Sequence, residues 1–134
     1  MTYGDIVTRA LRLLGVLYET ETASAEQGAD ALSQLNDMVA YWETDGVRIG
    51  YFSGDSTTET LNLDTRYRVP LEYNLALWLA PQFEREPSPI VVAIATDSYG
   101  KLLREAVQAN REEGIPQRPQ GEGSGYYVDI FNAT

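Results

Sequence analysis

The chain has 134 residues, and its 20 acidic against 10 basic residues give a formal charge of −10. Its length suits one domain, and its apolar content of 43% is typical of a globular chain. The acidic balance argues against a surface that wraps nucleic acid or binds an anionic membrane, because both need clustered Lys and Arg. Cysteine and histidine are absent, which excludes disulfides, thiolate or imidazole catalysis, and metal sites built from these ligands.

No targeting or membrane segment is expected. The N-terminal segment MTYGDIVTRALRLLGVL carries Asp5 where a signal peptide has basic residues, and two arginines interrupt its apolar part. Apolar runs are far shorter than the about 20 residues needed to span a bilayer. We therefore expect folding in a cytoplasm and no membrane partner.

The apolar periodicity predicts a first helix over residues 2–17, with Thr2 as N-cap and Asp5 in the first turn. One apolar stripe comprises Ile6, Ala10, Leu13 and Leu17. A second stripe lies beside it and comprises Val7, Leu11 and Leu14. The second stripe indicates either a broad core face or a contact between subunits, and we predict the three residues as interface candidates.

A second helix is predicted from Ser24 to about residue 43, opened by a capping box of Ser24 and Gln27 and closed by a left-handed Gly46. Its predicted buried face comprises Gly28, Ala31, Leu32, Leu35, Met38, Val39 and Trp42. The opposite face carries an acidic stripe of Glu26, Asp30 and Asp37. Between residues 24 and 46 there are five acids and no base, so half of the net charge lies on this helix.

Residues 47–63 show the alternation of a strand rather than a helix. Val47, Ile49 and Tyr51 alternate with polar residues or glycine, and turn-forming residues follow at 53–56. We predict a β-hairpin, or at least two extended arms, inserted between helices. Such a hairpin is marginal alone, so it must lean on the helices or on a neighbouring subunit.

A third helix is predicted over residues 70–83, with Pro70 in its first turn. It is apolar on almost every side, which predicts the central, most buried helix with Leu75, Trp78 and Leu79 in the core. A fourth helix is predicted from residues 88–89 to about 111. Its inner face comprises Val91, Ala95, Tyr99, Leu102 and Ala106, whereas Ile90 and Ile94 lie opposite and are predicted to contact another subunit.

Residues 114–125 are rich in Pro and Gly and predict an extended linker. The segment beyond it is apolar, with Tyr126, Tyr127, Val128, Ile130 and Phe131. It either folds back on its own domain or docks on another chain, and docking is favoured because the linker is long enough to leave the domain. The predicted architecture is mainly α: a four-helix antiparallel bundle over residues 1–113 with an inserted hairpin, and an extended C-terminal arm over 114–134.

Enzymatic chemistry has little support in the sequence. The glycines at 121, 123 and 125 lack the strand and helix that a phosphate loop requires. A carboxylate pair, as in glycoside hydrolysis, is the one route that remains, with Glu26 and Asp30 or Glu84 and Glu86 as candidates. Closely spaced acids without a base are usually a solvated face, so we predict no catalytic, cofactor or metal-binding residue. If many copies lined a pore, the acidic stripe would repel DNA phosphates and let a duplex slide.

Three segments in order resemble a known family. They are RALRLLGV at 9–16, ALSQLNDMVAYW at 31–42 followed by Asp45-Gly46, and PLEYNLALWLAP at 70–81. Together they look like the tail accessory factor, or head-to-tail adaptor (connector), of tailed bacteriophages, best known from short-tailed phages. The resemblance covers about residues 5–110.

The resemblance implies a structural protein of the virion's head–tail junction, assembled in the host cytoplasm. Such proteins form a ring, commonly of twelve subunits, beneath the portal protein after genome packaging. They extend the DNA channel without sequence-specific DNA binding, help retain the genome, and offer a platform to a downstream tail protein. A C-terminal extension of the family reaches the portal, which agrees with the composition of residues 126–131.

Two other classes of function stay open at this point. One is an acidic binding protein that acts alone, as a nucleic-acid mimic or a chaperone. The other is a hydrolase that uses one of the two carboxylate pairs.

Overall fold

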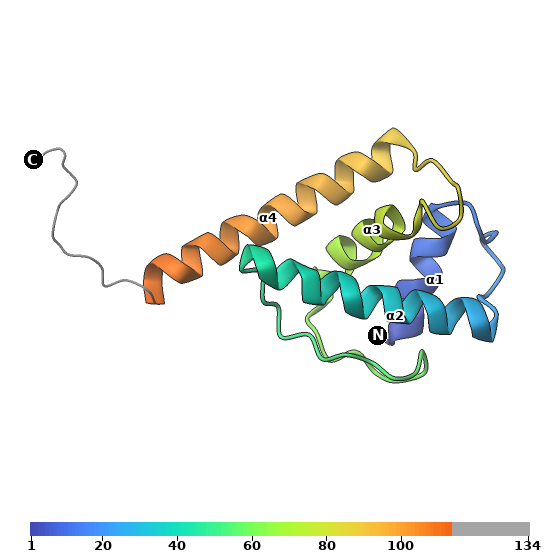
Figure 1. The fold of residues 1–134 in the computed structure, drawn as a ribbon, viewed down its shortest axis with the longest axis horizontal. Coiled ribbons are helices and arrows are strands. Elements are labelled where there is room, and N and C mark those ends of the chain that lie inside the picture. Colours follow the sequence, from blue (N-terminus) through green and yellow to red (C-terminus); the bar gives the residue numbers. More distant parts are fainter. Residues whose placement is uncertain (114–134) are drawn as a thin grey trace, which may run out of the picture. The chain divides into compact units, whose positions relative to one another are not determined.

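The structure is a computed structural model that describes residues 1–113, and it is mainly α-helical (Figure 1). Its helices are α1 (Tyr3–Leu13), α2 (Ala25–Trp42), α3 (Arg68–Leu79) and α4 (Pro89–Glu113), with short 3₁₀ helices η1 (Glu43–Asp45) and η2 (Thr65–Tyr67). Residues Met1–Leu103 form one compact unit, and Arg104 begins a second. The mainly α class is confirmed, whereas a domain boundary at residue 113 stays a prediction.

The core is built where α1, α2 and α3 pack against one another. The first part of α4 joins this unit through side chains: the Tyr99 ring lies 5.1 Å from that of Trp42, and Asn74 Nδ2 donates to the Ala95 carbonyl at 3.1 Å. Because α1, α2 and α3 form the core and α4 is divided between the two compact units, the predicted four-helix antiparallel bundle is not supported. Among the described residues, no helix has the length and apolar character needed to cross a membrane.

Both predicted helix starts are confirmed. Thr2 accepts the amide of Asp5 at 3.1 Å while the Asp5 carboxylate accepts that of Thr2 at 2.8 Å. Ser24 and Gln27 form the same reciprocal pair on α2. These side chains satisfy amides that have no partner within the helix.

Two features correct the prediction for the first helix. The helix ends at Leu13 rather than at residue 17, because Gly15 turns the chain with a φ of 77°. The second apolar stripe is covered within the chain, with Val7, Leu11 and Leu14 at most 6% exposed. This burial supports the broad core face and corrects the expectation of a subunit contact at these three residues.

All seven residues predicted for the inner face of α2 are buried, and Gly46 takes the predicted left-handed conformation with a φ of 83°. Periodicity was sufficient here because every residue of the stripe faces the same core.

Helix α3 is buried at Leu75 and Leu79, as predicted, but the prediction for Trp78 is wrong. Trp78 is 38% exposed, and its indole N–H donates to Gln34 Oε1 at 2.9 Å. At the edge of the core, a tryptophan can bury part of its ring while its indole N–H keeps a hydrogen-bond partner. A fully buried Trp78 would need such a partner inside the apolar core.

The predicted β-hairpin over residues 47–63 is wrong, since the described residues contain no strand. One isolated bridge joins Thr2 to Thr60, and the backbone of the segment instead pairs with the start of α1. The Gly4 amide donates to the Thr57 carbonyl at 2.9 Å, and the Leu61 amide donates to the Met1 carbonyl at 2.8 Å. Residues 47–63 therefore form an irregular segment, here called the docked segment. Its backbone bonds to the start of α1 instead of pairing one arm with the other.

On α4, Val91, Ala95 and Leu102 are buried as predicted. Ile90 is 67% exposed and Ile94 is half-buried. A contact of these two isoleucines with another subunit stays a prediction.

Replacing Leu75 with alanine should lower the free energy of unfolding by about 2–5 kcal/mol, because the side chain is fully buried at the centre of α3. Chemical denaturation of Leu75→Ala measures the loss, with Val92→Ala, on an exposed side chain, as the control. A loss below about 0.5 kcal/mol, as for an ordinary surface change, would show that this site is not core.

Candidate functional surface

The acidic stripe of Glu26, Asp30 and Asp37 is exposed along α2, opposite the buried face of the helix. Its predicted exposure is confirmed. Asp30 accepts a hydrogen bond from the side-chain amide of Gln82, which follows α3. Whether the stripe faces a channel stays a prediction.

An aromatic edge borders the stripe on the side of α3, and comprises Gln34, Tyr41 and Trp78. The rings of Tyr41 and Trp78 lie 5.9 Å apart at 53°, and Gln34 holds the Trp78 indole by the bond described above. Tyr41 is 61% exposed. Sequence analysis missed this edge because it took Trp78 for a core residue, although Gln34 and Tyr41 are seven residues apart and thus share a face of a helix.

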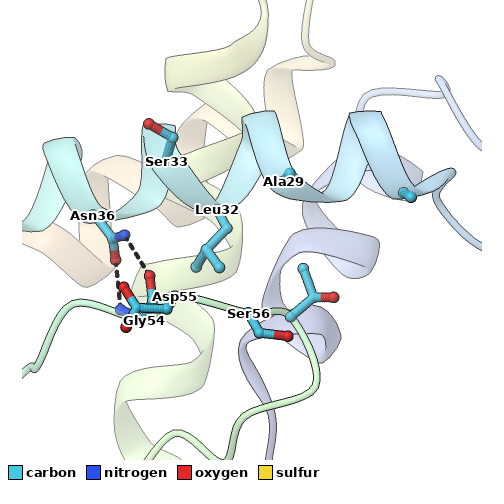
Figure 2. A pocket seen from close by; sticks show the side chains of 9 residues that line it. Ala29, Leu32, Ser33, Asn36, Gly54, Asp55 and Ser56 are labelled. Carbon is cyan, nitrogen blue, oxygen red and sulfur yellow. Dashed lines mark hydrogen bonds between the residues drawn. The ribbon is translucent and has the colours of Figure 1, made fainter.

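A groove of about 390 Å³ borders the stripe on the other side (Figure 2). Its lining comprises Ala25, Ala29, Leu32, Ser33 and Asn36 of α2, and Gly54, Asp55, Ser56 and Thr57 of the docked segment. Leu32 points from α2 toward the docked segment, and most of the other side chains are small. The groove exists because small residues on an exposed helix face lie beside a segment that is held at a fixed distance.

Hydrogen bonds from side chains hold the docked segment in place. Asn36 Oδ1 accepts from the Tyr51 hydroxyl at 2.6 Å and from the Gly54 amide at 3.1 Å, while Asn36 Nδ2 donates to the Gly54 carbonyl at 3.0 Å. The Tyr3 hydroxyl donates to the Phe52 carbonyl at 2.5 Å. The rings of Tyr3 and Tyr51 meet edge to face at 5.8 Å. Burial raises the pKa of Tyr51, so this hydroxyl remains a donor at any physiological pH.

Two glycines permit the close approach of this segment to α1. A Cβ at Gly54 would lie 2.8 Å from the Tyr3 ring, and a Cβ at Gly4 would lie 2.9 Å from the Thr57 carbonyl oxygen. Both distances are too short for a carbon contact, so larger residues would push the segment away from the helices.

Glu72 is a buried carboxylate between α1 and α3 that sequence analysis missed. It is 4% exposed, and it accepts from Arg68 Nε at 2.8 Å and faces Arg9 Nε at 4.0 Å. Burial raises the pKa of Glu72, and the two guanidinium groups oppose that rise without cancelling it. The hydrogen bond and charge of Glu72 also raise the pKa of Arg68. The spacing of Arg68 and Glu72, one helical turn apart, was the available signal.

The carboxylates proposed as catalytic pairs do not lie in a buried site. Glu26, Asp30, Glu84 and Glu86 are all exposed, and Glu84 adopts a φ of 53°, which is unusual for a residue with a side chain. Among the side chains that the structure describes, at residues 1–111, no cluster of acidic groups is arranged to hold a metal ion. The residues predicted to dock on the portal, Tyr126, Tyr127, Val128, Ile130 and Phe131, lie outside the described residues.

Comparison with known proteins identifies the family. The model of the family described as P22 tail accessory factor matches residues 1–132. The chain belongs to this family. The resemblance seen in the sequence is thereby confirmed. The chain is also similar to a protein of Acyrthosiphon pisum secondary endosymbiont phage 1 named peptidoglycan hydrolase gp27, with 26% identity over 133 residues that cover 94% of this chain and 83% of the relative.

In this tail accessory factor, replacing Asn36 with leucine should lower the free energy of unfolding by about 1–3 kcal/mol, because the Gly54 backbone and the Tyr51 hydroxyl lose their partners. Urea unfolding measures the change, and Asn62→Leu, at an exposed position of the same segment, is the matched control. Equal stability of the two variants would mean that Asn36 does not hold the segment.

The raised pKa of Glu72 predicts a specific pH dependence. Between the ordinary value of 4.5 and the raised value, the folded tail accessory factor binds more protons than the unfolded chain. The wild type should therefore lose stability relative to Glu72→Gln as the pH rises above 4.5, and the difference should become constant above the raised pKa. Urea unfolding at a series of pH values measures it, with the exposed Glu26→Gln as control. If the wild type instead becomes more stable relative to the Glu72→Gln variant as the pH rises over this range, the pKa of Glu72 is lowered in the folded state.

Proposed function

We propose that this tail accessory factor is a structural virion protein, a head-to-tail adaptor that forms a ring beneath the portal. The ring would extend the DNA channel, help to retain the packaged genome, and offer a platform to a downstream tail protein. The observation that carries the proposal is the family match, which spans residues 1–132 rather than one short segment. The protein would then reside at the head–tail junction after assembly in the host cytoplasm, in a ring of about twelve copies.

The exposed negative charge of α2 supports a position beside DNA that passes through the ring without binding tightly to it. Glu26, Asp30 and Asp37 form a negative surface that offers no counterion-releasing contact to phosphates. Facing the channel, it would repel a duplex and so let the DNA pass without sequence-specific binding. The exposed Ile90 and half-buried Ile94 of α4 are candidates for contacts between subunits or with another virion protein.

The C-terminal segment supplies the proposed contact with the portal. Its five large apolar side chains, at 126–128, 130 and 131, can each contribute about 1.5–3 kcal/mol when fully covered. Alternation of side chains along residues 127–131 suits addition of a strand to a sheet edge of the partner. A neighbouring adaptor subunit is the alternative partner.

A non-enzymatic role is part of the proposal, and the name of the relative, peptidoglycan hydrolase, makes a hydrolase the second candidate. The carboxylate with a raised pKa, Glu72, is tied to Arg68 and Arg9 rather than directed at a groove. Release of peptidoglycan fragments by the wild type, and its loss in Glu26→Gln, Asp30→Asn, Glu84→Gln or Glu86→Gln, would establish the hydrolase. The third candidate is a binding protein that acts alone. In that case the mass of a purified portal ring would not increase when this protein is added.

Deleting residues 115–134 should leave the helical fold intact and weaken binding to the portal by orders of magnitude, about 10²-fold or more, because several buried apolar anchors are lost together. Mass measurements of purified portal rings, mixed with the full chain or with the truncated chain, test this directly. Circular dichroism and thermal unfolding control for the fold. Equal binding by the two chains would refute the docking role of the segment.

A further inference from the structure

The two edges of the acidic stripe differ in shape and in chemistry. The aromatic edge of Gln34, Tyr41 and Trp78 projects large rings, whereas the groove on the other side is hollow and lined mainly by small side chains. Both edges belong to α2 and its immediate neighbours, and both lie beside the same three carboxylates.

We propose that the aromatic edge of one copy packs into the groove of the next copy. This inference rests on the proposed ring and names the surfaces through which its subunits meet. The contact is heterologous, because two different patches of the same chain meet, and repetition of such a contact builds a ring when the rotation closes. Since the acidic stripe lies between the two patches, every stripe would then face the same way around the ring.

The shapes of the two patches favour this contact, because one is hollow and the other projects large side chains. The groove has a volume of about 390 Å³, and small side chains at 25, 29 and 33 line it. Leu32 points from α2 toward the docked segment (Figure 2). Tyr41 and Trp78 are the large side chains exposed on the opposite edge. Because Gln34 already holds the Trp78 indole, the Trp78 side chain loses little conformational entropy on binding. Rigid aromatic side chains of this kind are the residues that most often dominate interfaces.

The charges of the chain favour the same contact. Two copies that each carry a formal charge of −10 repel, so the surfaces best suited to meet are uncharged. The aromatic edge is uncharged, and Asp55 is the acidic residue in the lining of the groove. The Tyr41 hydroxyl makes no hydrogen bond to any residue that the structure describes, so it can donate to the Asp55 carboxylate of the next copy. That bond would satisfy the charge that the contact covers.

Cross-linking through introduced cysteines tests the contact, since the chain has none of its own. The full chain carrying both Ala29→Cys and Thr44→Cys is assembled, alone and on purified portal rings, and treated with a short bismaleimide; Thr44 is exposed and adjacent to Tyr41, so the aromatic edge itself is kept. A ladder of multimers up to the ring is expected. A mixture of the two single-cysteine variants should stop at dimers, because each chain then has one reactive edge. The control pair, Tyr18→Cys with Ala93→Cys, carries its cysteines on exposed residues away from both patches and should give no ladder.

A second variant does not depend on cross-linking. Ala29→Trp fills the groove and should lower the association constant between copies by about tenfold or more, whereas Ala93→Trp on α4 should leave it unchanged. Circular dichroism establishes that both variants are folded. If the wild type forms a ring, but the double-cysteine chain gives no ladder and the ring tolerates Ala29→Trp, this contact is overturned and the proposed ring stays intact. A wild type that forms no multimer, with or without the portal, would overturn both.

Discussion

The docked segment over residues 47–63 is the feature on which the candidate surface depends. The segment forms no strand, so its backbone N–H and C=O groups are not paired within a sheet. Burying such groups without hydrogen-bond partners would cost free energy of folding. The start of α1 and the side chain of Asn36 supply the partners instead. Gly4 and Gly54 allow the short distances that these bonds require. The irregular segment is thereby fixed beside α2 and forms one wall of its groove.

Helix α2 consequently presents three different surfaces around its exposed side. Its centre is acidic, one edge joins the aromatic pair of Tyr41 and Trp78, and the other edge opens into the groove. Its buried face packs against α1 and α3. One helix therefore anchors the fold and also carries the surfaces proposed to face the channel and the neighbouring subunits. Changes at Ala29 or Tyr41 should affect assembly with little effect on folding, because they leave the core contacts and the hydrogen bonds of Asn36 intact.

The sequence was informative where one physical rule decided the structure. The N-cap at Thr2, the capping box of Ser24 and Gln27, and the inner face of α2 followed from local pairing and from helical periodicity, and all three are confirmed. Periodicity could not separate a core stripe from a subunit contact at Val7, Leu11 and Leu14, because both need apolar side chains. It also failed at residues 47–63 and at Trp78, since tertiary partners such as Asn36 and Gln34 determine those conformations. The resemblance in sequence order identified the family, which composition alone did not.

We propose that copies of this chain form a ring on the portal, with the exposed acidic side of α2 toward the channel. The most direct test is an electron cryo-microscopy reconstruction of the full chain bound to purified portal, at a resolution that places side chains. We expect a closed ring in which Glu26, Asp30 and Asp37 of every subunit line the bore. A ring with these carboxylates buried against basic residues of a partner, or turned to its outer surface, would show that α2 does not line the channel.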